Sequence, residues 1–118
     1  MKKLSAAILD FASPLTDGLP AGTPIDARRE TLRIAITLWN ALSLKTAGQG
    51  EMFADLMDRF RKLPHPQSVV MASLVREMLQ RRLRLYPDDN RLVGDWELRD
   101  LGNGEVSLRT DVLAPPEK

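Results

Sequence analysis

The sequence contains no cysteine and only one histidine among its 118 residues. Without cysteine the chain forms no disulfide and offers no thiolate ligand to a metal. Zinc and non-haem iron sites usually take two or more histidine or cysteine ligands, which a single histidine cannot supply. We therefore expect no metal and no cofactor, and the composition suits a reducing compartment such as the cytoplasm.

Long apolar runs are also missing. No stretch approaches the roughly 20 apolar residues that a membrane-spanning helix needs. The chain begins like a secretion signal, with Lys2 and Lys3 before apolar residues, but Asp10 interrupts that apolar stretch too early. We expect a cytoplasmic protein without membrane contact, made of a single domain over residues 1–113 and a loose C-terminal tail over residues 114–118.

Catalytic motifs are absent as well. No glycine run follows the phosphate-loop pattern, and no serine stands in a nucleophile elbow. His65 lies between Pro64 and Pro66, which places it in a loop. The carboxylates of Asp55 and Asp58 share one side of a predicted helix, but their spacing is not that of a calcium-binding loop. We assign no catalytic residue and no metal ligand, and we do not expect an enzyme.

Helical periodicity is the strongest feature that is present. Apolar residues between positions 25 and 44 recur every three or four residues and define the face of one helix: Ile25, Leu32, Ile36, Trp39 and Leu42. Thr23 is placed to cap this helix, with Pro24 after the cap. We predict that this helix is the centre of the core, with Ile36 and Trp39 buried.

Three more helices are predicted from similar apolar stripes, over about 4–15, 51–63 and 66–86. Pro14 should bend or end the first of them, because proline removes a backbone hydrogen bond inside a helix. The Pro64-His65-Pro66 segment separates the third from the fourth.

After residue 91 the apolar period changes from helical to alternating, which indicates two strands over 92–101 and 105–113. A three-residue loop, Gly102-Asn103-Gly104, would set Leu98 opposite Leu108 and Trp96 opposite Thr110. One face of this hairpin should lie on the helices, namely Trp96, Leu98, Val106, Leu108 and Val112. The predicted fold is mainly α, a compact bundle of about four helices with a C-terminal antiparallel β-hairpin (about 91–113), in the α+β class.

Charge is unevenly distributed along the chain. Residues 1–87 hold 13 Lys or Arg against 8 Asp or Glu, whereas residues 88–118 hold 4 against 8. The sharpest basic cluster, at the end of the fourth predicted helix, offers possible phosphate contacts: Arg76, Arg81, Arg84 and Arg91. The acidic hairpin would neutralise this cluster if the two lie together in the fold.

Three functional hypotheses follow. The leading hypothesis is a non-enzymatic interaction or accessory protein that self-associates as a homodimer or binds another protein, through Trp96, Leu98, Leu108 and the hairpin edge. The second is a nucleic-acid-associated regulator that uses the arginine cluster. The third is a small-molecule binder or enzyme with a pocket near Asn40 and His65.

Overall fold

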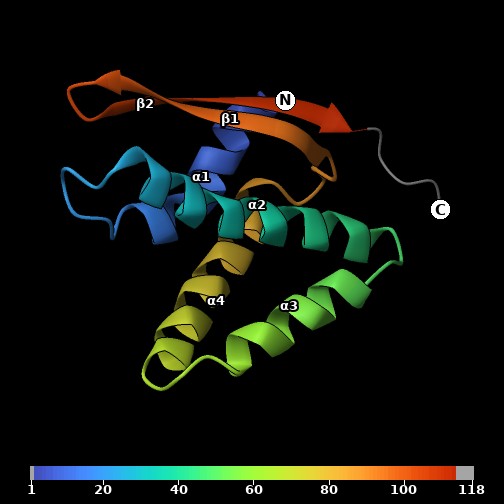
Figure 1. The fold of residues 1–118 in the computed structure, drawn as a ribbon. Coiled ribbons are helices and arrows are strands. Elements are labelled where there is room, and N and C mark those ends of the chain that lie inside the picture. The colour runs from blue at the N-terminus through green and yellow to red at the C-terminus, as the bar shows by residue number, and fades with distance from the viewer. Residues whose placement is uncertain (1, 114–118) are drawn as a thin grey trace.

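The computed structural model of the chain describes residues 2–113 (Figure 1). Its helices are α1 (Leu4–Thr16), α2 (Ile25–Thr46), α3 (Glu51–Arg61) and α4 (Gln67–Leu85), and its strands are β1 (Leu92–Gly102) and β2 (Glu105–Leu113). This order confirms the predicted α+β class, a helical bundle that ends in an antiparallel hairpin. The predicted loose tail, residues 114–118, lies outside the described residues.

Helix α2 is the central element. Figure 1 shows the hairpin on one side of α2 and the pair α3 and α4 on the other, while α1 contacts α2, α4 and β2. None of the described helices combines the length and the apolar character that crossing a bilayer requires.

Trp39 of α2 lies at the centre of the core and is fully buried, and Ile36 is only 5% exposed, as predicted. The Trp39 indole meets the ring of Phe11 at 5.3 Å and that of Tyr86 at 6.0 Å, both edge to face. Its Nε1 donates a hydrogen bond to the Arg91 carbonyl at 2.8 Å, so the polar atom of this large side chain is satisfied inside the core.

The start of α2 differs from the prediction. The helix begins at Ile25, but Pro24 occupies the cap position and no side chain caps the first turn. The hydroxyl of Thr23 donates instead to the Pro20 carbonyl within the preceding loop. The predicted Thr23 cap is therefore wrong. Pro24 still suits this boundary, because its fixed φ leads the chain into the helix.

Helix α1 continues through Pro14 instead of ending there. A proline inside a helix leaves the carbonyl oxygen four residues earlier without its usual amide donor. For Pro14 this is the carbonyl of Asp10. Arg81 of α4 supplies the missing donor, since its Nε lies 3.0 Å from this oxygen. The helix tolerates proline because a distant side chain satisfies the freed backbone group.

Polar side chains of α2 hold β1 by its backbone. Asn40 donates from Nδ2 to the Val93 carbonyl at 2.9 Å and accepts from the Val93 amide at 2.8 Å, as a neighbouring strand would. Arg29 donates from Nη2 to the Leu98 carbonyl at 3.0 Å. Because β1 has only β2 as a strand neighbour in the described structure, these bonds satisfy groups at its other edge.

The predicted register of the hairpin is confirmed, with Leu98 opposite Leu108 and Trp96 opposite Thr110. The turn differs: Asn103 and Gly104 both have positive φ, 54° and 79°, which is the pattern of a two-residue hairpin turn. The extra residue is Leu101, which lies between the paired positions Asp100 and Gly102 as a bulge and restores the register.

A second irregularity lies between Val93 and Trp96, nearer the end of the hairpin. Val112, which the sequence placed on the buried face, is 52% exposed. The extra residue lies in β1, so the buried positions of that strand change from Trp96 and Leu98 to Val93. Strand β2 keeps its alternation, and Val112 is exposed near its end.

Candidate functional site

The predicted interaction surface on the hairpin lies largely inside the chain's own core. Leu98 is 3% exposed and Leu108 is 8% exposed, because this face of the hairpin packs on α1 and α2. Trp96 is half-buried, with the Arg33 guanidinium 5.4 Å from its ring. Of the three residues assigned to a contact with a partner, Trp96 is the one that retains accessible surface.

Of the four arginines predicted to contact phosphate, two bind carboxylates of this chain and two are exposed. Arg81 forms an ion pair with Asp10, and Arg91 holds Asp89 with its Nη2 2.7 Å from Oδ2. Burial would raise the pKa of Asp89, but the hydrogen bonds from Arg91 outweigh it and lower the pKa below the usual 3.8. Arg76 and Arg84 are exposed and form no ion pair or hydrogen bond with any described residue. The possible phosphate surface is therefore reduced to these two.

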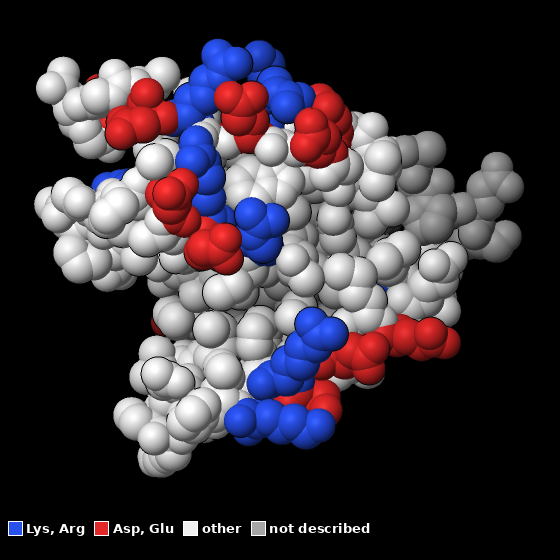
Figure 2. Space-filling view, in the orientation of Figure 1, with Lys and Arg blue, Asp and Glu red and all other residues white. Residues whose placement is uncertain are grey.

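The acidic hairpin does not neutralise the basic helix. Its carboxylates pair with the hairpin's own arginines: Arg99 with Glu97 at 2.8 Å, and Arg109 with Asp111 at 2.8 Å. Figure 2 shows the result at the top of the molecule, where blue and red side chains alternate over the hairpin. Three carboxylates of the hairpin, Asp95, Glu97 and Asp111, are thus paired with its own two arginines.

Arg82 is buried rather than paired with a hairpin carboxylate. Its Nη1 donates to the Trp39 carbonyl at 2.8 Å, and its Nη2 donates to Ser43 Oγ at 2.9 Å and to the Asp89 carbonyl at 2.6 Å. Its guanidinium carbon lies 4.1 Å from the Trp39 ring centre. Burial lowers the pKa of Arg82 to about 10, against the opposing attraction of Asp89, so the side chain remains charged at neutral pH.

Asn40 and His65 do not share a pocket. Asn40 faces the hairpin and uses its amide on Val93, whereas His65 is an exposed residue of the loop between α3 and α4. Figure 1 shows that the hairpin and this loop lie on opposite sides of α2. The two residues predicted to share a pocket therefore lie apart, with Asn40 bonded to β1.

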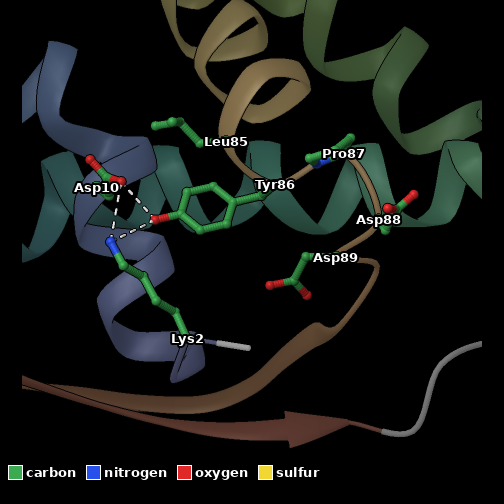
Figure 3. A pocket seen from close by; sticks show the side chains of 7 residues that line it. All are labelled: Lys2, Asp10, Leu85, Tyr86, Pro87, Asp88 and Asp89. Atoms are coloured by element: carbon green, nitrogen blue, oxygen red, sulfur yellow. Dashed lines mark hydrogen bonds and ion pairs between the residues drawn. The ribbon is translucent and has the colours of Figure 1, made fainter.

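An open pocket of about 440 Å³ lies instead where the end of α4 meets α1 (Figure 3). Tyr86 donates a hydrogen bond to Asp10 Oδ2 at 2.6 Å, and Lys2 Nζ lies 3.3 Å from the Tyr86 hydroxyl and 3.8 Å from the same carboxylate. Leu85, Pro87, Asp88 and Asp89 complete the lining. Figure 3 shows Asp88 at the end of the pocket remote from Asp10.

Three polar side chains of this pocket, Lys2, Asp10 and Tyr86, already bind one another. The hydrogen bond from Tyr86, followed by Arg81 and Lys2, outweighs burial and lowers the pKa of Asp10 from its usual 3.8. Burial and the bond to Asp10 raise the pKa of Tyr86 above its usual 10.0. Asp10 is thus an ionised carboxylate that accepts hydrogen bonds, and Tyr86 is a protonated phenol that donates one. Neither is poised to exchange a proton near pH 7.

Helices α3 and α4, which together we call the arm, carry accessible apolar surface. No residue of α3 is buried. On α4 only Val75, Met78 and Arg82 are buried. Val69 and Val70 at the start of α4 are 59% and 56% exposed, and Leu83 is 73% exposed.

Two hollows lie on the surface of the arm. A groove of about 380 Å³ between the two helices has an apolar floor that includes Met57, Phe60 and Leu79, with Arg61 and Arg76 also lining it. A second hollow of about 390 Å³ lies at the tip, lined by Leu63, Pro66, Gln67, Val70 and Met71. On the face shown in Figure 2 the lower left tip, where α3 and α4 meet, is uncharged.

The sequence contained a signal for this surface that the helix-face analysis did not use. Residues 69–75 include apolar side chains at almost every position, so they surround α4 instead of marking one face. A helix that is apolar on all sides needs cover on all sides. The stripe through Met71, Leu74 and Val75 predicted burial on one side and left the apolar residues on the other side without a partner.

Among residues 2–113 no group of three or more histidine, aspartate or glutamate side chains gathers as a metal site would require. The arm and the Tyr86 pocket are the two candidate sites that we consider. The arm is apolar and open. In the pocket, Lys2, Asp10 and Tyr86 bind one another. Comparison of the chain with family models, curated proteins and solved structures finds no match.

Proposed function

We propose that this chain is a small non-enzymatic interaction or accessory protein that acts as a homodimer. The observation that carries the proposal is the arm: a helix without any buried residue, packed beside another with apolar side chains at six of the seven positions 69–75. Contiguous exposed apolar surface of this kind is typical of protein contact sites.

The energetics favour a covered arm. Burying a large aliphatic side chain contributes roughly 1.5 to 3 kcal/mol, so Val69, Val70 and Leu83 together represent several kcal/mol that the single chain does not use. A partner would recover this contribution. Isolated apolar residues on a surface are ordinary, but here Val70 lines one of two hollows on the same pair of helices.

The Tyr86 pocket supports the same proposal. A ligand that used Lys2, Asp10 or Tyr86 would have to break the bonds that these groups already make with one another. The bonds of Arg81 and Tyr86 to Asp10 also tie α1 to the end of α4. The role proposed for this cluster is to hold α1 and α4 together.

Two surfaces are candidates for the contact between copies. One is the arm. The other is the hairpin side, where Trp96 keeps part of its ring accessible and Val112 and Leu113 are 52% and 51% exposed. The hairpin carries several ion-paired arginines and carboxylates. Charged residues on an edge strand oppose pairing with a strand of another molecule.

Sedimentation equilibrium of the full chain, from about 1 to 200 µM, tests the proposal. This range includes the micromolar dissociation constants of the weaker interfaces of standard size. We expect the average mass to rise with concentration toward that of two chains. A mass equal to one chain throughout this range would refute the homodimer.

A further inference from the structure

We infer that the arm of one copy is covered by the arm of a second copy, with the two α4 helices antiparallel across a two-fold axis. The inference rests on the proposed homodimer and names the surface through which it forms. It is carried by three features of the arm: the spacing of its exposed residues, the sizes of the side chains that would meet, and the order of charges along α3.

The first feature is a second apolar stripe on α4, separate from the stripe that faces the core. It comprises Val69, Ala72, Arg76, Leu79 and Leu83, which alternate spacings of three and four residues. All but the half-buried Leu79 are exposed, whereas the core stripe holds Val75, Met78 and Arg82. Spacing of this kind is that of a helix-pairing seam, and the rise from Val69 to Leu83 is about 21 Å. We call these five residues the seam.

The second feature is that the seam complements itself. An axis between Ala72 and Arg76 would set Arg76 opposite Ala72 of the second copy, and Leu79 opposite Val69 of that copy. Arg76 and Leu79 then each meet a shorter side chain, Ala72 and Val69. The two Arg76 guanidiniums stay in separate layers, so the only charge of the seam does not face its own copy.

The third feature is the charge along α3, which flanks the seam across the groove. Its carboxylates, Glu51, Asp55 and Asp58, precede its cations Arg59 and Arg61, and Lys62 follows directly. Two antiparallel copies place the acidic half of one α3 at the level of the basic half of the other. Parallel copies would place like charges at the same level, so the charge order favours the two-fold arrangement.

Two seam substitutions test the surface. Val69→Lys and Leu83→Lys alter side chains that are 59% and 73% exposed, so the fold of the single chain should tolerate both. Across the seam Val69→Lys would bring a new ammonium against Leu79 and toward Arg76 of the second copy. Leu83→Lys would bring one to the level of the loop between α3 and α4 of that copy. We expect each to raise the dimer dissociation constant at least about tenfold in sedimentation equilibrium. Circular dichroism of the variants would verify that the helices are retained.

Matched variants on the hairpin serve as controls. Leu101→Lys makes the same change at a side chain that is 58% exposed on the bulge, and Val112→Lys does so on the alternative surface, at 52% exposed. We expect both to dimerise like the unaltered chain. A dimer lost in Val112→Lys but kept in both seam variants would overturn the seam and leave the proposed homodimer standing. An unaltered chain that is monomeric at all concentrations would overturn both.

Discussion

Arg82 is the residue whose placement is least expected from its chemistry. It is 6% exposed, and it gives three hydrogen bonds to oxygens of α2 and of the loop before β1. No carboxylate oxygen is among these acceptors; the Asp89 side chain is held by Arg91. Arg82 thus joins α2, α4 and the start of the hairpin by binding carbonyl and hydroxyl groups that would otherwise be buried without donors.

Replacing Arg82 should therefore be costly. We expect Arg82→Ala to lower the free energy of unfolding by about 3 kcal/mol or more, because it leaves a cavity beside Trp39 and removes the donor from buried oxygens. Urea denaturation measures this change. Arg84→Ala, two residues further along α4, removes an exposed guanidinium and should change the free energy by no more than about 0.5 kcal/mol. Equal effects of the two variants would contradict the role assigned to Arg82.

Asp10 leads to a prediction about pH. Because the pKa of Asp10 is lowered in the folded chain, its ionised carboxylate stabilises the fold above the usual value of 3.8, and this contribution is lost as the pH falls through the folded-state pKa. Asp10→Asn should cost about 1 to 2 kcal/mol at pH 7, where it weakens the bonds from Arg81 and Tyr86. Its difference from the unaltered chain should shrink toward pH 2.

Urea denaturation of both proteins at the two pH values tests this. Asp17→Asn is the control, since Asp17 is exposed at the end of α1 and its side chain makes no ion pair within the described structure. A difference for Asp10→Asn that persists unchanged at low pH would show that its carboxylate charge does not stabilise the fold.

At the scale of elements, apolar periodicity predicted the helices, the strands and the pairing of Leu98 with Leu108. These depend on which residues must leave water, and that information is spread over many positions. The details that failed depend on single hydrogen bonds. Pro14 does not end α1 because Arg81, far along the chain, binds the Asp10 carbonyl, and no local pattern around Pro14 reveals such a donor.

The candidate sites show the same division. The arginine cluster was visible in the sequence, but its division into paired Arg81 and Arg91 and exposed Arg76 and Arg84 depends on carboxylates that the fold brings near. Leu98 and Leu108 were correctly predicted to lie opposite each other on one face of the hairpin. Whether that face meets the chain's own helices or a partner is decided by tertiary packing, which sequence periodicity does not contain.

The attachment of the hairpin to α2 gives a prediction at this scale. Asn40→Asp keeps the size of the side chain and the acceptor for the Val93 amide, but it replaces the donor to the Val93 carbonyl by a carboxylate oxygen. We expect a loss of about 2 kcal/mol in the free energy of unfolding and faster hydrogen exchange of the Val93 amide. Gln80→Glu makes the same chemical change at an exposed site on α4 and should be nearly neutral. If the two variants were equally stable, Asn40 would not be the attachment that the geometry indicates.

At the scale of the whole molecule, the two sides of α2 differ in how they are completed. On the hairpin side, buried leucines and the bonds from Asn40 and Arg29 close the core within one chain. On the other side, α3 and the first half of α4 extend from α2 with accessible apolar surface (Figure 1). A second copy on the arm would give both sides of α2 a closed core. Folding and association would then be linked.

That linkage predicts how thermal stability depends on concentration. If two chains unfold together, mass action raises the midpoint of unfolding by about 3 °C for each tenfold increase in protein concentration, for a dimer with the unfolding enthalpy usual for chains of this length. Differential scanning calorimetry between about 5 and 500 µM measures the slope. Val69→Lys should remove it while leaving a cooperative transition at the lower temperature of the single chain, whereas Leu101→Lys should keep it. A midpoint that does not move with concentration in the unaltered chain would mean that the arm is stable uncovered, and the several kcal/mol attributed to its cover would then have no source in self-association.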